Sequence, residues 1–229
     1  MASKVPRHIA IILDGNRRYA KKLGMQPWKG HEFGLKKLED LFRWCMELGI
    51  KELTIYCFST ENFKRAKNEI NYLFDLFWKE FKKIQESKTI YKDKIKVNVI
   101  GRIGMFTGKM QKAMNDAIRK TQKNRELIVN FALAYGGRQE IIDAFKKIMK
   151  NKIKAKSINE KVITENLYLQ SEPDFVIRPG GEMRTSNFLT WQSIYSEWFF
   201  VPKLWPEFTK DDLMWCIEEY NKRERRFGK

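Results

Sequence analysis

Long hydrophobic runs are absent from this sequence of 229 residues. No segment approaches the roughly 20 apolar residues that cross a bilayer, and residues 1–6 lack the apolar core of a signal peptide. The three cysteines, Cys45, Cys57 and Cys216, each lie in an apolar segment and form no CxxC pair. Three buried, reduced thiols are the simplest explanation, and we therefore expect a cytoplasmic protein.

Several familiar catalytic signatures are also missing. The chain contains no Walker lysine motif, no GxGxxG, no HExxH and no nucleophile elbow. Its only histidines, His8 and His31, have no cysteine or histidine neighbours at the spacing of metal ligands. The sequence therefore argues against a zinc site.

Acidic residues are in the minority, since 45 basic and 28 acidic residues give a formal charge of +17. Such a balance favours anionic partners, namely nucleic acid, an anionic membrane or phosphorylated metabolites. A lysine-rich, solvated surface without a specific partner explains the charge equally well. Because the basic residues are dispersed and match no nucleic-acid module, we expect no nucleic-acid partner.

The composition, with 43% hydrophobic and 14% aromatic residues, is that of a globular protein. Short apolar runs typical of strands alternate with segments of helical periodicity. The predicted strands cover 9–13, 53–58, 95–100, 127–133, 174–177 and 198–201. The predicted helices cover 17–23, 31–49, 69–86, 107–121, 139–151 and 210–222, with a further short helix up to 169. This alternation predicts a single α/β domain over 1–229, with a mostly parallel, twisted sheet flanked by helices.

Polar residues follow the predicted strands where each strand ends. Asp14 closes the first strand, Ser59 and Glu61 the second, and Arg178 a late one. Because the carboxyl ends of parallel strands share one edge, these residues should converge. The stretch 14–19 adds a glycine, turn amides and two arginines, which suit a divalent cation with a phosphorylated ligand. An ordinary capped turn with solvated arginines is the alternative interpretation.

The stretch 178–187 is the second polar cluster. Gly180 and Gly181 allow the backbone to approach a ligand closely. Arg178, Arg184 and Ser186 supply donors of the kind that bind diphosphate. A plain turn with surface arginines is the alternative here.

Five sequence blocks carry a family resemblance. They are DGNRRY at 14–19, FSTEN at 58–62, YGGR at 135–138, RPGGEMRTSNF at 178–188 and RERRFG at 223–228. In this order they resemble the conserved blocks of the cis-prenyltransferases, the undecaprenyl and dehydrodolichyl diphosphate synthases. The first block resembles eukaryotic and archaeal members. The closing Arg-Phe-Gly resembles homodimeric enzymes of the archaeal or bacterial type, in which the C-terminal residues reach the partner's active site.

The resemblance implies a Mg²⁺-dependent condensation. Isopentenyl diphosphate would be added repeatedly, with cis double bonds, to an allylic diphosphate such as farnesyl or geranylgeranyl diphosphate. The product would be a long-chain polyprenyl diphosphate, the precursor of a glycosyl carrier lipid, held in a hydrophobic tunnel. Candidates to line the tunnel, each equally compatible with a plain core position, are Cys57, Phe74, Phe77, Ile100 and Phe131. A homodimer with peripheral membrane contact is implied as well.

The resemblance also implies roles for individual residues. Asp14 would bind Mg²⁺, with Glu197 near the metal. The catalytic group comprises Asp14, Asn16, Ser59 and Asn62. The substrate-binding group comprises Gly15, Asn16, Arg17, Arg18, Tyr19, His31, Ser59, Thr60, Glu61, Phe63, Arg65, Arg178, Arg184, Thr185, Ser186, Arg226 and Gly228.

Two positions depart from the family pattern. Pro27 stands where many members have an arginine that grips the allylic diphosphate, so either Lys29 substitutes or the grip is weaker. Met183 stands where many bacterial members have a histidine, and a thioether is a poor ligand for a hard cation. A non-catalytic accessory subunit is the main alternative, but such subunits lose the Asp-Gly-Asn block that this chain keeps. A Mg²⁺-dependent phosphohydrolase is less well supported, because paired carboxylates for two metal ions are missing.

Overall fold

The computed structural model describes residues 5–223, which build a six-stranded sheet with the order β3-β4-β2-β1-β5-β6. All five neighbouring strand pairs are parallel, as predicted. The strands are β1 (His8–Ile12), β2 (Glu52–Ser59), β3 (Ile95–Ile100), β4 (Leu127–Tyr135), β5 (Phe175–Pro179) and β6 (Glu197–Val201). The helices are α1 (Asn16–Lys22), α2 (Gly30–Glu47), α3 (Lys67–Ile84), α4 (Lys88–Lys92), α5 (Gly108–Thr121), α6 (Gly137–Lys150), α7 (Glu160–Asn166) and α8 (Lys210–Lys222).

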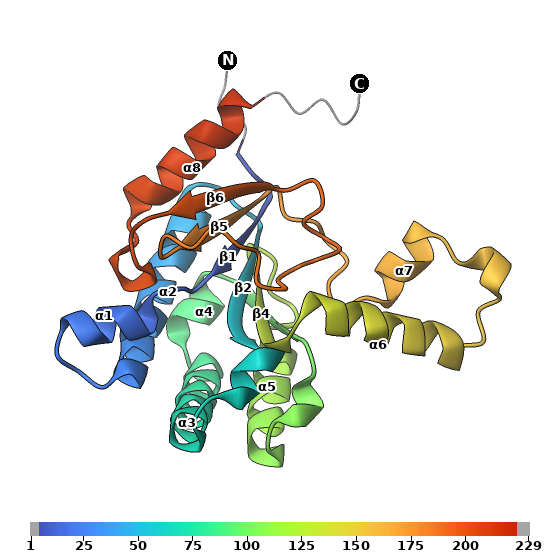
Figure 1. Ribbon diagram of the computed structural model, residues 1–229, viewed down its shortest axis with the longest axis horizontal. Helices are drawn as coiled ribbons and strands as arrows, with labels where there is room; N and C mark the ends of the chain where they lie inside the picture. The colour runs from blue at the N-terminus through green and yellow to red at the C-terminus, as the bar shows by residue number, and fades with distance from the viewer. Residues whose placement is uncertain (1–4, 224–229) are drawn as a thin grey trace.

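The larger core lies on one face of the sheet. Alternate strand residues such as Ile9, Ile55 and Val129 contact apolar side chains from α2, α3, α5 and α8 there. A smaller core on the opposite face packs Ile12 and Tyr56 against Phe188 and other residues. Because successive strand residues point to opposite faces, each strand contributes to both cores. Helices α6 and α7 lie side by side in an arm that extends away from the sheet (Figure 1).

The chain reverses its direction across the sheet at β1. Strand β2 pairs with one side of β1, and β5 returns to pair with the other side. In open parallel sheets, ligands bind beyond the carboxyl ends of strands at such a switch point. The turn after β1 and the end of β5 therefore form the expected position of a binding site.

The sequence prediction located the strands and the long helices but missed shorter elements. These are α4 and the 3₁₀ turns at Pro27–Lys29, Thr60–Lys64, Ile103–Met105, Ala155–Ser157 and Trp205–Glu207. Ile100, a candidate either for the tunnel lining or for a plain core position, lies in the core on the opposite face of the sheet from Phe77 and Phe131. Ile100 belongs to the smaller core, whereas its strand neighbours Ile95 and Val97 belong to the larger one.

Candidate active site

The turn after β1 and the end of β5 are joined through Asp14. Its Oδ2 accepts a hydrogen bond from Arg178 Nη2 at 2.7 Å, and its Oδ1 accepts one from Arg18 Nη2 at 3.2 Å. The Arg178 side chain is 4% exposed and that of Asp14 is 26% exposed. Asp14 thus presents a carboxylate at the edge of a cavity while a buried guanidinium fixes its orientation.

Two glycines allow this close approach of backbones. Gly15 has φ +102°, and a Cβ there would lie 2.9 Å from Leu204. Gly180 also has φ +102°, and a Cβ there would lie 2.7 Å from Arg18 Nη2. Arg18 donates to the Gly180 carbonyl at 2.7 Å. Only glycine combines these backbone angles with that proximity, so both glycines of the sequence motifs have a geometric reason.

Helix α2 packs tightly on the turn that precedes α1. A Cβ on Gly34 would lie 2.3 Å from Asn16 Oδ1, so α2 approaches the buried Asn16 closely. Asn16 Nδ2 donates to the Leu13 carbonyl at 3.0 Å, which fixes the amide. This packing brings His31, in the first turn of α2, to the same cavity.

Three buried polar atoms at this cavity have no hydrogen-bond partner within residues 5–223: Asn16 Oδ1, His31 Nε2 and Arg178 Nε. Buried polar atoms are normally paired, and an unpaired one costs about 1–3 kcal/mol. A polar ligand in the cavity would satisfy them. Burial lowers the pKa of His31 to about 3, with Arg65 and Arg17 adding to the effect. His31 is therefore neutral near pH 7.

Glu69, in the first turn of α3, organises two arginines over the cavity. Its side chain is 6% exposed, and Arg65 Nη1 lies 3.0 Å from Glu69 Oε1. Arg17 Nε lies 3.8 Å from the same oxygen. Nothing in the sequence marks Glu69 as a site residue, because an acidic residue at a helix start is usually solvated.

The segment 184–189 folds back onto Arg178. Arg178 Nη1 donates to Ser186 Oγ at 2.7 Å and to the Arg184 carbonyl. Ser186 has φ +51° and Asn187 has φ +61°, which is the left-handed region. Non-glycine residues that hold this conformation often cluster at functional sites. The strained backbone here directs a serine hydroxyl at the buried arginine.

Asn187 is a second residue that sequence analysis did not assign. Its Nδ2 donates to Glu61 Oε1 at 3.1 Å and to Gln139 Oε1 at 3.0 Å. Its Oδ1 accepts from the Arg138 amide at 2.9 Å. Asn187 therefore ties the segment after β2, the start of α6 and the segment after β5 together. The signal in the sequence was asparagine itself, which tolerates left-handed backbone better than most residues.

Three cavities meet at this edge. A polar cavity of about 330 Å³ is lined by Asp14, Ser59, Asn62 and Arg178 among others. An outer cavity of about 430 Å³ shares Asp14 and His31 with it. An apolar cavity of about 410 Å³ lies between β2, β4, α2 and α3. The apolar and polar cavities share three lining residues, Leu35, Cys57 and Phe77.

Most predicted site residues line the polar or the outer cavity. They are Asp14, Gly15, Asn16, Arg17, Arg18, His31, Ser59, Asn62, Arg65, Arg178, Arg184 and Ser186. The predicted residues that line neither are Tyr19, Thr60, Glu61, Phe63, Thr185 and Glu197. Arg226 and Gly228 lie outside the described residues.

The expectation that Glu197 lies near a metal held by Asp14 is not met within this chain. Glu197 is the first residue of β6, and in the parallel register it is level with Phe175 and Ile9. Asp14 lies beyond the opposite end of the strands. Glu197 instead accepts a hydrogen bond from Arg223 at 2.7 Å.

Phe63, predicted to bind substrate, lies in an aromatic cluster instead. Its ring contacts Phe58, Phe74 and Phe106.

Lys29 is engaged away from the cavities. Its Nζ lies 3.2 Å from Glu32 Oε1 and 5.2 Å from the centre of the Tyr72 ring. Lys29 therefore does not replace the arginine that many members have at the position of Pro27, because its side chain lines neither the polar nor the outer cavity. Lys21 of α1 lines the outer cavity instead. Met183 is 81% exposed and lines none of the three cavities.

Within residues 5–223, no group of three or more His, Cys, Asp or Glu side chains could hold a metal ion. Mg²⁺ differs from metals that need such a cage, because it is often bound by one or two carboxylates together with substrate phosphates and water. The single carboxylate of Asp14, beside unpaired polar atoms of a phosphate-sized cavity, fits that mode.

In the described part of the chain, no helix is long and apolar enough to cross a membrane.

Acid should weaken this fold through His31. Its pKa is near 6.5 when unfolded and about 3 when folded, so the unfolded state takes up a proton first as the pH falls. Between pH 7 and pH 5 this one group lowers the free energy of unfolding by about 2 kcal/mol. In His31→Gln the loss of urea resistance over that interval should be correspondingly smaller. An equal loss in both proteins would contradict the assignment.

Comparisons with known proteins agree with this geometry. Residues 12–228 match the family model described as "Putative undecaprenyl diphosphate synthase". A geranylgeranyl-diphosphate-specific tritrans,polycis-undecaprenyl-diphosphate synthase of Thermococcus kodakarensis is 48% identical, over 100% of this chain and 89% of the relative. An isoprenyl transferase of Thermus thermophilus is 42% identical, over 98% of this chain and 89% of the relative.

A solved structure shares the fold. Lavandulyl diphosphate synthase from Lavandula x intermedia, in complex with dimethylallyl diphosphate, superposes with a TM-score of 0.92. It is 32% identical and covers 98% of this chain and 99% of its own. The motifs, the sheet topology and these matches lead to one conclusion: the chain belongs to the undecaprenyl diphosphate synthase family of cis-prenyltransferases.

Proposed function

We propose that this enzyme condenses isopentenyl diphosphate onto geranylgeranyl diphosphate and repeats the step to make a long cis-polyprenyl diphosphate. One observation carries the proposal: the polar cavity with Asp14 and Arg178 adjoins the apolar cavity, and the two share Leu35, Cys57 and Phe77 as lining residues. A diphosphate in the first places its prenyl chain in the second. The choice of starter is supported by the specificity named for the Thermococcus relative.

Each substrate would meet a different set of donors. Arg17, Arg18 and Arg65 line the outer cavity and would bind the allylic diphosphate. Arg178 and Ser186 line the polar cavity and would bind isopentenyl diphosphate, with Arg184 between the two. The allylic carbon–oxygen bond breaks, the new carbon–carbon bond forms, and a proton leaves isopentenyl diphosphate.

Charge stabilisation is the main task of these side chains. Breaking the carbon–oxygen bond leaves negative charge on the departing diphosphate, and fixed guanidinium groups stabilise it without reorganisation. Asp14 would hold Mg²⁺, which supplies further neutralisation of that charge when bound. Neutral His31 would donate one hydrogen bond from Nε2–H to a diphosphate oxygen without adding a charge.

The function is tested with labelled isopentenyl diphosphate, Mg²⁺ and either farnesyl or geranylgeranyl diphosphate. Chromatography of the products should show a ladder that ends at one length, with faster incorporation from geranylgeranyl diphosphate. Preference for farnesyl diphosphate would reject the starter assignment alone. No incorporation from either starter, by folded protein, would favour the accessory-subunit alternative.

Cys57 offers a test of the path taken by the chain, because it lines both the polar and the apolar cavity. Cys57→Phe should fill the junction and stop elongation early, so that the products shorten by several isoprene units while the first condensation continues. Cys57→Ser, which keeps the side-chain size, is the matched control and should keep the product length. An unchanged length in Cys57→Phe would show that the chain grows elsewhere.

The functional unit that we propose is a homodimer. Helix α6 exposes Ile142 (49%) and Phe145 (45%) on one face, and a second copy would cover them. A mixture of Asp14→Ala and Arg226→Ala subunits should then recover part of the activity, since one composite site would keep both residues. Verified heterodimers without any recovery would place both residues in the same site or reject the role of Arg226.

A further inference from the structure

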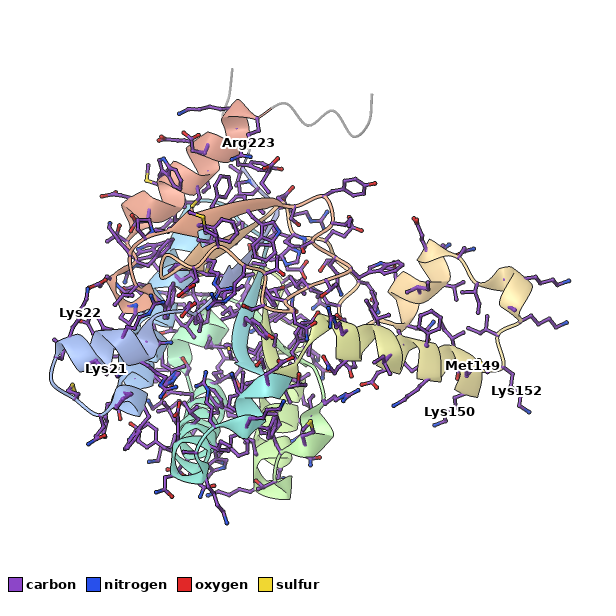
Figure 2. The ribbon with its side chains drawn as sticks, in the orientation of Figure 1. Lys21, Lys22, Met149, Lys150, Lys152 and Arg223 are labelled. Atoms are coloured by element: carbon purple, nitrogen blue, oxygen red, sulfur yellow. The ribbon has the colours of Figure 1, made fainter. Side chains whose placement is uncertain are left out.

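The tip of the arm formed by α6 and α7 carries an unusual concentration of positive charge. Between 144 and 159 there is no acidic residue, and six lysines lie there: Lys146, Lys147, Lys150, Lys152, Lys154 and Lys156. Met149, Lys150 and Lys152 lie at the outer end of α6, remote from the sheet (Figure 2). We refer to residues 149–156 as the basic tip.

The lysines of the basic tip are not used inside the protein. Lys146, which precedes the tip, lies 3.8 Å from Asp143, and Lys147 donates to the Asn166 carbonyl at 3.0 Å. By contrast, none of the four lysines within the tip makes an ion pair with any residue between 5 and 223. All four are exposed. Their charge is therefore available to an external anion.

The basic tip also presents apolar surface. Met149 lies one turn beyond Phe145, past the pair that we assign to the partner subunit, and is 72% exposed; among the described residues only Met183 is a more exposed large hydrophobic residue. Ile153 is only partly buried between Lys152 and Lys154. Lysines that surround exposed aliphatic side chains are typical of segments that rest on anionic lipid, where headgroups bind the charge and the interface accepts the apolar groups.

We propose that the basic tip docks this enzyme on the surface of an anionic lipid bilayer. The benefit of such docking rests on the proposed function, because a long polyprenyl product would have to pass from the enzyme into a membrane. Nucleic acid fits the tip less well: residues 146–159 contain no aromatic side chain to stack on bases and no arginine to read phosphate or base edges in a bidentate manner. Lysine ammonium groups suit a diffuse anionic surface.

The test measures binding to vesicles without substrate. Wild-type protein should sediment with vesicles containing about one third phosphatidylglycerol and not with pure phosphatidylcholine. A tip variant should lower the partition coefficient about 50-fold or more. It combines Lys150→Gln, Lys152→Gln, Lys154→Gln and Lys156→Gln. The matched control removes the same charge elsewhere and should bind nearly as wild type does; it combines Lys82→Gln, Lys88→Gln, Lys92→Gln and Lys123→Gln.

Other outcomes overturn the proposal. Equal losses in both variants would mean that overall charge, and not the tip, drives binding. Undiminished binding of the tip variant, or binding to an RNA oligonucleotide in place of vesicles, would reject the tip as a lipid-docking surface. None of the four substituted tip lysines lines a cavity, so prenyl transfer without vesicles should be unchanged. Vesicle binding without any prenyl transfer would reject the proposed function and leave the docking surface intact.

Discussion

Asp14→Asn is expected to lower kcat at least about 1000-fold, a loss of roughly 4 kcal/mol of transition-state stabilisation. The substitution keeps the shape of the side chain and removes its charge. Without the carboxylate, the site has no anionic oxygen where both the polar and the outer cavity meet, and we expect Mg²⁺ to bind far more weakly. Steady-state turnover over a wide range of Mg²⁺ concentrations measures the effect.

The fold should survive this change. Arg178 would still donate to Ser186 Oγ and to the Arg184 carbonyl, so its buried charge keeps partners. Asp211→Asn, an exposed position on α8, is the matched control and should leave turnover unchanged. Near-normal activity of Asp14→Asn at all Mg²⁺ concentrations would reject the metal role. Loss of activity together with loss of cooperative unfolding would indicate a structural role.

The fold was predictable because its signals are local. Apolar runs rich in β-branched residues ended at polar turns, and helical periodicity filled the intervals between them. Convergence of Asp14, Ser59 and Arg178 then followed from one geometric rule, that parallel strands end at the same edge. The structure confirms that these three residues line one cavity.

Single residues were harder to assign than elements. Ile100 was compatible with the tunnel or with a core position, and the alternation along β3, which sends Val97 and Val99 to the larger core, puts Ile100 in the smaller one. Glu197 was assigned near the metal through the family resemblance alone. The parallel strand predicted at 198–201 already puts this residue at the start of the strand, and the register of β6 makes it level with Phe175 and Ile9, away from Asp14.

Long-range side-chain contacts were equally hidden from the sequence. Glu69 looks like an ordinary first-turn acid, yet it is buried and pairs with Arg65 and Arg17, two residues that line the outer cavity. Asn187 contacts Glu61 and Gln139, partners 126 and 48 residues away. No pattern within a short stretch of sequence predicts such contacts, because they depend on how the segments that follow β2, β4 and β5 pack against one another.

Arg178→Lys should have the second large effect, a loss of about 100-fold or more in kcat/KM for isopentenyl diphosphate. One guanidinium serves Asp14 Oδ2 at 2.7 Å, Ser186 Oγ at 2.7 Å and the Arg184 carbonyl, and its Nε remains for a ligand. A lysine keeps the charge, but its donors share one nitrogen and cannot span these positions.

The matched control for this prediction is Arg102→Lys. Arg102 also forms a bidentate pair, with Asp143 at 2.8 and 3.0 Å, but it lines none of the three cavities. It should therefore affect stability slightly and leave kcat/KM unchanged. If Arg178→Lys also keeps its kcat/KM, charge alone suffices at this position and the fork geometry has no catalytic value. If instead KM rises strongly while single-turnover chemistry at saturation persists, Arg178 binds isopentenyl diphosphate without otherwise positioning Asp14.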